Sequence, residues 1–423
     1  MKIIVAHPGR QHSFRVAKAL KENGMLYKYA TTVYNKDNSL FMRFVKLFLS
    51  KDNLDRAKKR KCPSLVDNDV IQFCELEGLM LLALQRIDRS HRIDRWFMRY
   101  IANKFQRRLA DYVIKNRVDA VISYDTNSSV LFDILERKAP DVIKIMDNAH
   151  PNRHFLNKSY NENWTAVGNF GATLEACGYI TDEKVAETFG EEVKKADYHI
   201  VASTYSTQAL VFEGISPDYI FKIPYGVDEN KFVGKDRSYT SDFLNVLFIG
   251  EVNQRKGINQ ILQVAKHIHD QGFNFNIVGG GFETAPIEYS KYNDCVNFLG
   301  RVSFETLLCQ LKDNHVFLFP TMGEGFGLVL LEAMAAGLPV ITTPNCAGYD
   351  IVKDGVNGFI VPVGDENAIE EKLIWMKEHP CELKCMSENA ISTARMYTWG
   401  KYEKGLVTAV KKMMDYTSVK TSL

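Results

Sequence analysis

The stretch VFLFPTMGEGFGLVLLEAMAAGLP, residues 316–339, decides the fold. Its first four residues are apolar and predict a short buried strand, and a turn with glycine at 323, 325 and 327 follows them. Small and apolar residues from Phe326 onward favour a helix. This order of strand, glycine-rich turn and helix is typical of a parallel α/β sheet, in which ligands bind beyond the carboxyl ends of the strands. We therefore look for chemistry in the loops that follow strands.

Short apolar runs alternate with amphipathic stretches over most of the 423 residues. The alternation predicts two Rossmann-like domains whose parallel sheets face a central cleft. Strands are expected near 2–6, 118–123, 142–146, 198–202, 219–223, 245–249, 274–278, 315–319, 339–342 and 358–361. A polar linker near 224–240 separates a first domain, 1–224, from a second domain, 225–396. We expect a last helix in 397–423 that crosses back to the first domain.

Charge is unevenly distributed in the first domain. Segment 41–61 carries 8 Lys and Arg against 2 Asp and Glu, and segment 86–117 carries 10 against 3, although the net charge of the chain is only +2. The small net charge argues against a general polyanion binder, and we expect no nucleic acid partner. The basic helical insertion, 40–117, favours contact with an anionic surface such as a membrane.

Two stretches of this insertion are amphipathic. Segment 40–49 places its apolar residues on one helical face, and segment 93–105 does the same with Ile93, Trp96, Phe97, Tyr100, Ile101 and Phe105. Basic amphipathic helices bind anionic membranes. The alternative is that both apolar stripes pack into the core of the domain.

The chain has no apolar stretch of the roughly 18 to 20 residues that a membrane span needs. Its N-terminus reads as a buried strand rather than a signal peptide. The 8 cysteines are scattered without a C-x-x-C pair, which predicts reduced and mostly packed thiols. We expect a cytoplasmic protein, peripheral at the inner face of the membrane if the basic helices bind there.

The helix that begins near Phe326 suits a phosphate, because it presents unpaired backbone N–H groups and the positive end of its dipole. Glu324 stands just before this helix. Glu332 lies in its second turn, where side chains lean toward the helix N-terminus and a ligand bound there. The alternative is that both are ordinary solvated acids. Apolar surroundings favour burial, where an unpaired carboxylate is costly, and so favour a function.

Two glutamates separated by seven residues around Gly-Phe-Gly resemble the signature of glycosyltransferase family four, the retaining GT-B group also called group 1. Four other blocks resemble this family in order and spacing: Ile223–Asp228, Phe248–Gly257, Val296–Gly300 and Tyr397–Trp399. The resemblance covers residues 200–415 well and the first half loosely. It departs at Glu251, where the family commonly has arginine.

The resemblance implies roles for the matching residues. Glu332 would hold the nucleotide ribose, and Glu324 would contact the transferred sugar. Arg255 and Lys256 would neutralise the diphosphate leaving group, a role otherwise given to a metal ion. The distal phosphate would be held by the backbone N–H groups of Phe326, Gly327 and Leu328. We therefore expect no metal and no cofactor besides the donor substrate.

Loops elsewhere complete the implied site. Gly280 would let the backbone approach the nucleotide, and Arg301 lies in the loop that would face the base. In the first half, Gly9 would touch the donor phosphate. His150, slightly preferred over Asp147, would lie near the reacting sugar.

A metal site is the alternative for this region, because His7, His12, His150 and His154 fall in two loops. Their spacing defines no coordination geometry, so we expect none. The only D-x-D-like element, Asp67-x-Asp69, is interpreted as solvated.

The resulting hypothesis is a retaining, metal-independent glycosyltransferase of hexosyltransferase type. It would move a sugar from a nucleotide diphosphate donor to a sugar or lipid-linked glycan acceptor in polysaccharide or glycolipid assembly. A nucleotide-sugar epimerase or hydrolase of similar fold is one alternative, and a non-catalytic membrane-associated scaffold is another. The donor sugar, the base, the acceptor, the linkage and the oligomeric state stay open.

Overall fold

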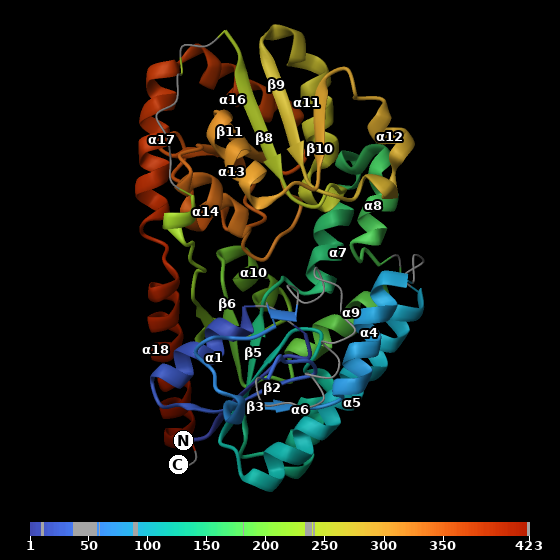
Figure 1. Cartoon of the computed structure of the whole chain (residues 1–423), viewed down its shortest axis with the longest axis vertical. Coiled ribbons are helices and arrows are strands. Elements are labelled where there is room, and N and C mark those ends of the chain that lie inside the picture. Colours follow the sequence, from blue (N-terminus) through green and yellow to red (C-terminus); the bar gives the residue numbers. More distant parts are fainter. Residues whose placement is uncertain are drawn as a thin grey trace. The chain divides into compact units, whose positions relative to one another are not determined.

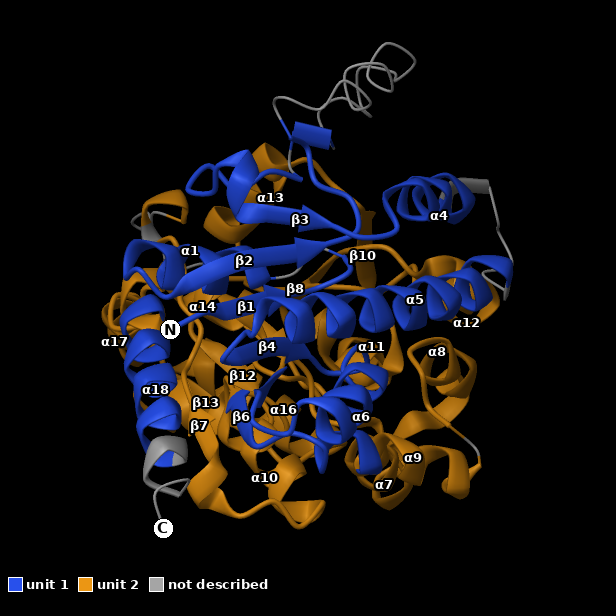
Figure 2. Ribbon diagram, turned by 90° about the horizontal axis from the view of Figure 1, so that it is seen from below, with its two compact units in different colours: residues 1–147, 191–200, 403–423 blue, residues 148–190, 201–402 orange. Residues whose placement is uncertain are grey.

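The computed structural model describes residues 1–9, 12–36, 57–58, 60–87, 92–180, 182–232, 239 and 242–420. These residues form two parallel β-sheets with helices connecting their strands (Figure 1). The chain divides into two compact units, coloured separately in Figure 2. Residues 1–147, 191–200 and 403–423 form the first unit, and residues 148–190 and 201–402 form the second. The predicted fold class, α/β with two Rossmann-like sheets, is confirmed.

The first sheet has seven strands in the order β3-β2-β1-β4-β5-β6-β7. Their bounds are β1 Ile3–Ala6, β2 Leu26–Thr31, β3 Val70–Gln72, β4 Ala120–Tyr124, β5 Ile143–Asn148, β6 Tyr198–Val201 and β7 Ile220–Lys222. The main helices between and after them are α1 Ser13–Glu22, α4 Glu75–Ile87, α5 Arg92–Asn116, α6 Ser129–Lys138 and α18 Trp399–Lys420. The strand order reverses between β1 and β4, which is the switch point of a doubly wound sheet.

The second sheet has six strands in the order β10-β9-β8-β11-β12-β13. Their bounds are β8 Leu244–Ile249, β9 Phe273–Val278, β10 Val296–Gly300, β11 Val316–Phe319, β12 Val340–Thr342 and β13 Gly358–Ile360. Its order reverses between β8 and β11, so its switch point lies where these two strands end. The loops that follow β8 and β11 therefore begin next to each other.

The helices of the second unit follow the same alternation. They are α7 Arg153–Glu162, α8 Gly171–Ala176, α9 Glu183–Val193, α10 Thr204–Phe212, α11 Ile258–Ile268, α12 Pro286–Ser290, α13 Phe304–Asp313, α14 Leu328–Ala335, α15 Gly348–Ile351, α16 Glu366–Glu378 and α17 Pro380–Ala394, the last residues of α9 lying in the first unit. The strands of the sheet are mainly buried and apolar, with β11 and β12 buried throughout. This is the composition that parallel strands covered on both faces require.

Each strand predicted from the sequence overlaps an observed one, but β2, β3 and β10 were missed. Uninterrupted apolar runs identify the strands that are buried on both faces. β2 and β10 mix polar with apolar residues and are only partly buried, and β3 is only three residues long. Strands at or near a sheet edge have less surface to bury, so their sequences carry a weaker signal. β3 also lies inside the range 40–117, which the sequence had indicated to be a helical insertion.

The stripe predicted in segment 93–105 divides in the structure. Ile101 and Phe105 are buried in the core of the first unit, whereas Ile93, Trp96 and Tyr100 are exposed. The core interpretation is therefore right for the later turns of this helix, whereas its first turns face outward and membrane binding stays a prediction. The other stripe, 40–49, lies outside the described residues.

Two smaller expectations were wrong. All 8 cysteines are free, but they are not mostly packed, because Cys177, Cys309, Cys381 and Cys385 are exposed. Asp69 is not simply solvated: its carboxylate accepts a hydrogen bond from Lys21 Nζ at 2.6 Å and another from the backbone N–H of Val66. Asp69 therefore links helix α1 to the turn that precedes β3.

Candidate functional site

The loops after β8 and β11 leave the second sheet at its switch point, and they meet beyond the carboxyl ends of the strands. Arg255 and Lys256 come from the first loop, and Glu324 comes from the second. The backbone joins the loops, since the N–H of Met322 donates to the carbonyl oxygen of Arg255 at 2.9 Å. The structure thus brings three of the predicted catalytic residues into one cluster within the second unit.

The Arg-Lys pair is fixed by a short turn, Gln254–Lys256. Asn253 caps this turn, because its side chain accepts a hydrogen bond from the backbone N–H of Lys256. Gly257 ends it with φ of 74°, and a Cβ at this position would lie 2.0 Å from the carbonyl oxygen of Pro320. Only glycine fits such a left-handed position under a neighbouring strand end. The Lys-Gly sequence therefore reflects packing as well as charge.

The loop that carries Glu324 is also held by close backbone approaches. A Cβ at Gly325 would lie 2.1 Å from the carbonyl oxygen of Ala149, and a Cβ at Gly323 would lie 2.6 Å from Leu156. The Glu324 N–H donates to the carbonyl oxygen of Asn345 at 2.9 Å. Because the loop lies directly on residues 149–150, Glu324 is brought close to His150.

Three cationic or titratable groups surround the Glu324 carboxylate, whose side chain is 10% exposed. Arg255 Nη1 donates to Oε2 at 2.6 Å, and Lys256 Nζ forms an ion pair with the same oxygen. His150 Nδ1 lies 3.9 Å from Oε1, with the imidazole about half exposed. Lys256 Nζ also lies 4.8 Å from the centre of the Phe319 ring, a cation–π contact. Two positively charged side chains thus face one negative charge.

The pKa values reflect this arrangement. Burial alone would raise the pKa of Glu324, but the charges of Lys256 and Arg255 outweigh burial and hold that pKa well below its usual range. Burial lowers the pKa of Lys256, and the attraction of Glu324 opposes that shift. Glu324 is therefore ionised at neutral pH, and it stabilises the charged forms of both neighbours.

The helix after this loop, α14, begins at Leu328, two residues later than predicted. Gly327 precedes it with φ of 85°, again a left-handed position. The backbone N–H groups of Phe326, Gly327 and Leu328 donate to no group among the residues that the structure describes. The Phe326 side chain is buried against the ring of Tyr225, with centroids 5.3 Å apart. The turn predicted to bind a phosphate therefore presents three backbone donors that bond to no described residue.

Two buried serines, which we did not single out from the sequence, fix the peptide bond before this seat. Ser203 Oγ and Ser206 Oγ both donate to the carbonyl oxygen of Gly325. In a trans peptide the carbonyl and the following N–H point in opposite directions. Holding the Gly325 oxygen therefore also fixes the direction of the Phe326 N–H. The contact joins residues more than a hundred positions apart, which sequence patterns do not reveal.

Glu332 lies on α14, and no described residue forms an ion pair with it. Burial raises the pKa of its carboxyl group, and no other cause acts on it. Among the described residues, no donor contacts this carboxylate. It is available to hydroxyl groups of a ligand, as its predicted role requires.

Gly280 and Arg301 form a separate group where β9 and β10 end. A Cβ at Gly280 would lie 2.2 Å from Arg301 Nε, so the guanidinium covers this glycine. Arg301 Nη2 also lies 3.5 Å from Oε2 of Glu251, and both side chains are largely exposed. Glu251, which stands where the family commonly has arginine, thus faces the loop predicted to meet the base.

Gly9 belongs to the first unit, and the structure does not place it with the cluster of the second. Its N–H donates to His7 Nδ1 at 2.9 Å. Burial lowers the pKa of His7 to about 4, so this histidine is neutral at neutral pH. Asp147, at the end of β5, is buried and pairs with His12 Nε2 at 2.8 Å. His150, the alternative to Asp147, lies in the second unit beside Glu324.

Within the described part of the chain, no three His, Cys, Asp or Glu side chains converge as metal ligands. The four histidines considered for a metal divide into different contacts, because His12 pairs with Asp147 and His154 Nδ1 pairs with Glu213 at 2.9 Å.

Known proteins resemble this chain in sequence. The family model for glycosyl transferases group 1 matches residues 236–393. A capsular polysaccharide biosynthesis glycosyltransferase of Staphylococcus aureus is 36% identical over 156 residues, 35% of this chain and 40% of the relative. A phosphatidyl-myo-inositol mannosyltransferase of Mycobacterium leprae is 28% identical over 217 residues, 50% of this chain and 56% of the relative. Matches to the first curated relatives span about half of their length.

Solved structures resemble the fold over nearly the whole chain. A sucrose-phosphate synthase of Thermosynechococcus elongatus has a TM-score of 0.66 at 17% identity and covers 98% of this chain and 100% of its own. HepE of Anabaena in complex with UDP-glucose has a TM-score of 0.61 at 13% identity and covers 97% and 100%. Such low identities speak for the fold alone. The solved structures show that this chain has the GT-B fold, and the family model shows that its residues 236–393 resemble the group 1 glycosyl transferases.

Proposed function

We propose that this protein transfers a glycosyl group from a nucleotide diphosphate sugar to a sugar or lipid-linked glycan, with retention of anomeric configuration. The observation that carries the proposal is the buried cluster of Arg255, Lys256 and Glu324 next to the free N–H groups before α14. The cluster has one positive charge in excess. Free backbone donors and excess positive charge are what a diphosphate needs.

In the proposed reaction, the bond between the anomeric carbon and the diphosphate oxygen breaks, and a bond from that carbon to the acceptor oxygen forms on the same face. The acceptor proton passes to the departing phosphate oxygen. Arg255 and Lys256 neutralise the negative charge that develops on the leaving group. Stabilising such developing charge is usually the largest single contribution to catalysis. Glu324 holds both cations in place and accepts hydrogen bonds from hydroxyls of the transferred sugar.

Other residues bind the donor in this scheme. The N–H groups of Phe326, Gly327 and Leu328 hold the distal phosphate. Glu332 accepts hydrogen bonds from the ribose hydroxyls, and the backbone at Gly280 with Arg301 faces the base. His150 approaches the reacting sugar from the side of Glu324. No metal is required, because two protein cations supply the charge.

Related proteins indicate where to start with substrates. The names of several relatives refer to capsular polysaccharide, amylovoran or colanic acid biosynthesis. One structural neighbour is a complex with UDP-glucose. A UDP-sugar donor and a glycan acceptor are therefore the first combination to test.

The test begins with a thermal-shift screen against UDP, GDP and ADP and their sugars, since a ligand of the folded state raises the melting temperature by mass action. Nucleotide release from the stabilising donor is then measured with and without glycan acceptors. We expect release that depends on an acceptor and yields an α- or β-linkage matching the donor. Release without acceptor would favour the epimerase or hydrolase, and the absence of any stabilising nucleotide would favour the scaffold.

We also propose that the first unit docks on an anionic membrane. Exposed apolar side chains gather on two helices that pack together, α4 and α5: Leu76, Met80, Ile93, Trp96, Met98 and Tyr100. Lys104 Nζ on α5 binds Glu77 on α4 at 2.5 Å, which joins the helices. Exposed Arg95 and Arg99 accompany the aromatic residues. Tryptophan, tyrosine and arginine in this combination suit the interface between water and lipid.

Membrane docking is tested by sedimentation with vesicles of neutral lipid, with and without anionic lipid. Trp96, 68% exposed, is the largest apolar contributor. We expect Trp96→Ser to weaken binding to anionic vesicles about tenfold, and Trp164→Ser, an exposed tryptophan of the second unit, to leave it unchanged. Equal binding by wild type and Trp96→Ser would contradict the proposal. In the described part of the chain, no helix has both the length and the apolarity to cross a bilayer.

A further inference from the structure

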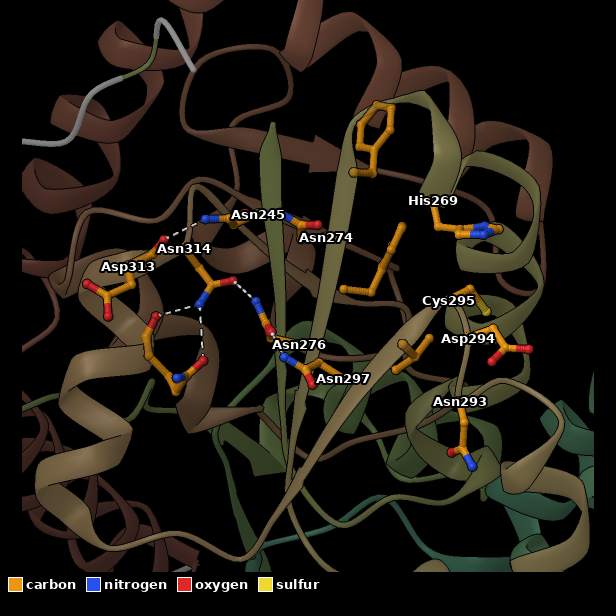
Figure 3. A pocket seen from close by; sticks show the side chains of 14 residues that line it. Asn245, His269, Asn274, Asn276, Asn293, Asp294, Cys295, Asn297, Asp313 and Asn314 are labelled. Atoms are coloured by element: carbon orange, nitrogen blue, oxygen red, sulfur yellow. Dashed lines mark hydrogen bonds between the residues drawn. The ribbon is translucent and has the colours of Figure 1, made fainter. Parts of the chain in front are cut away.

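A groove of about 550 Å³ lies in the second unit, lined by the strands β8, β9 and β10, by the residues before β10 and by the end of α13 (Figure 3). Six of its fourteen lining residues are asparagines, and a glutamine joins them. The groove belongs to the first half of these strands. The loops that carry Lys256 and Glu324 leave the same sheet from its opposite end.

The asparagines lie on one face of the sheet because of strand alternation and register. Asn245 of β8 pairs with Asn274 of β9, and Asn276 of β9 pairs with Asn297 of β10. The residues between them, such as Phe275, point to the other face and are buried in the core. Asparagine is unfavourable in strands. Four on three adjacent strands therefore call for an explanation beyond folding.

Hydrogen bonds order these amides into two chains. In one, Asn274 Nδ2 donates to Asn245 Oδ1, and Asn245 Nδ2 donates to the carbonyl oxygen of Asp313, each within 3.0 Å. In the other, Asn297 Nδ2 donates to Asn276 Oδ1, and Asn276 Nδ2 donates to Asn314 Oδ1. Figure 3 shows these bonds as dashed lines. The amide groups are thus oriented in advance rather than free to rotate.

Each chain begins at an exposed amide. The Oδ1 atoms of Asn274 and Asn297 accept no hydrogen bond from any described residue, and each amide nitrogen has a second hydrogen. Both side chains are exposed. The groove therefore offers fixed donors and acceptors side by side, at a spacing of about 5 to 8 Å set by neighbouring strands.

The charges of the groove indicate the class of ligand. Among the described residues, no lysine or arginine lines it, and the formally charged ones that do are Asp294 and Asp313. A phosphate, an acidic glycan or a nucleic acid would need cations there. Sugar hydroxyls both donate and accept hydrogen bonds, and oriented amides match them in both roles without charge.

We propose that this groove is a second, non-catalytic binding site for a neutral glycan. It goes beyond the proposed transfer activity, because it requires neither the nucleotide nor the catalytic cluster. Asn245 precedes the last residue of β8, Ile249, by four positions. Because strands rise about 3.3 Å per residue, Asn245 lies more than about 10 Å from the end of β8, where the loop of that cluster begins. A glycan held there would belong to the same polymer at a point distant from the reacting end.

The test uses the full chain on an array of neutral and acidic oligosaccharides, followed by titration of the strongest neutral ligand. We expect wild type to bind neutral members, and the double variant Asn274→Val, Asn297→Val to bind at least tenfold more weakly. Valine raises strand propensity at both positions, so the fold is expected to persist. Asn389→Ala, at an exposed asparagine of α17, is the matched control and should bind as wild type does.

Nucleotide titration of the same variants separates the two sites. We expect donor nucleotide to bind the double variant and wild type alike, so a failure of the proposed activity would leave the glycan result intact. The groove proposal is overturned if wild type binds no neutral member of the array, if acidic members bind best, or if the double variant binds like wild type.

Discussion

At its carboxyl end the second sheet gathers buried charges, and at its amino end it gathers exposed neutral amides. Lys256 and Glu324 come from loops, and each is held by a partner of opposite charge. Asn274 and Asn297 stand on strands, and backbone register sets their spacing. The loops therefore concentrate charge, as the proposed diphosphate site requires, whereas the strands provide a flat set of weak contacts. The two proposed sites are compatible with one sheet because they fall on different parts of each strand.

The contrast is tested most strongly by removing charge from the carboxyl end. Lys256→Met keeps a chain that can pack on Phe319, and Arg255 still pairs with Glu324. We expect turnover to fall about 10² to 10³-fold, the usual loss when one charge-stabilising group of a transition state is removed. Initial rates of nucleotide release with saturating acceptor measure it.

Lys266→Met is the control for this variant, because Lys266 is an exposed lysine of α11 in the same unit. Its rate should equal that of wild type. A rate for Lys256→Met within threefold of wild type would contradict the role of Lys256 in neutralising the leaving group. Binding of the neutral glycan to the groove should not change in either variant, which keeps the two ends of the sheet distinguishable.

A smaller effect is expected from the two serines that hold the Gly325 carbonyl. The double variant Ser203→Ala, Ser206→Ala frees this peptide to rotate, so the Phe326 N–H loses its fixed direction. We expect kcat/KM to fall about tenfold, corresponding to roughly one hydrogen bond. The single variant Ser206→Thr keeps a hydroxyl at this position and should retain most of the wild-type kcat/KM.

Ser203 also caps α10, since its side chain accepts a hydrogen bond from the Ser206 N–H. Ser303→Ala provides the matched control, because Ser303 caps α13 in the same way. Both caps contribute about 1 kcal/mol to stability. If Ser303→Ala lowered kcat/KM as much as the serine pair does, the effect would come from stability rather than from the direction of one N–H.

The charged end could be predicted from the sequence, and the amide end could not. Glu324 and the helix start lie in one short segment whose glycines indicate a close approach of the backbone to a ligand, and the family resemblance added Lys256. The pairing of Arg255 and Lys256 with one carboxylate still needed the structure, since it joins two loops about seventy residues apart. In the groove, the alternation of Asn274 and Asn276 is visible, but the register that adds Asn297 and Asn314 depends on strand order.

Edge position explains the other omissions. β3 and β10 end their sheets, and each is only partly buried, so neither shows the apolar run by which buried parallel strands are identified. The serine contact to Gly325 was missed for a different reason. Ser203 and Ser206 are typical residues of a helix start, and Ser203 does cap α10. Their sequence context does not indicate a contact with Gly325.

The substitution Glu332→Gln is expected to give the smallest change, and it tests thermal stability and nucleotide binding together. Because burial raises the pKa of its carboxyl group, the folded state holds the proton more tightly than the unfolded state does. The stability that this group contributes is present below its unfolded pKa and is lost as pH rises through the folded pKa. Glu332→Gln removes that loss. We expect the melting temperature of the variant to match wild type at pH 4 and to exceed it by about 1 to 2 °C at pH 8.

The same substitution should weaken nucleotide binding by roughly tenfold, because an amide is a poorer acceptor than a carboxylate for two ribose hydroxyls. Calorimetric titration with the donor nucleotide at pH 8 measures this loss beside the thermal gain. Glu388→Gln, at an exposed glutamate of α17, should change neither quantity. A Glu332→Gln variant that gained stability but bound nucleotide as tightly as wild type would remove Glu332 from the ribose site. In that case, the charged side chains that bind the donor at the carboxyl end of the sheet would all come from the loops, where Lys256 and Glu324 lie.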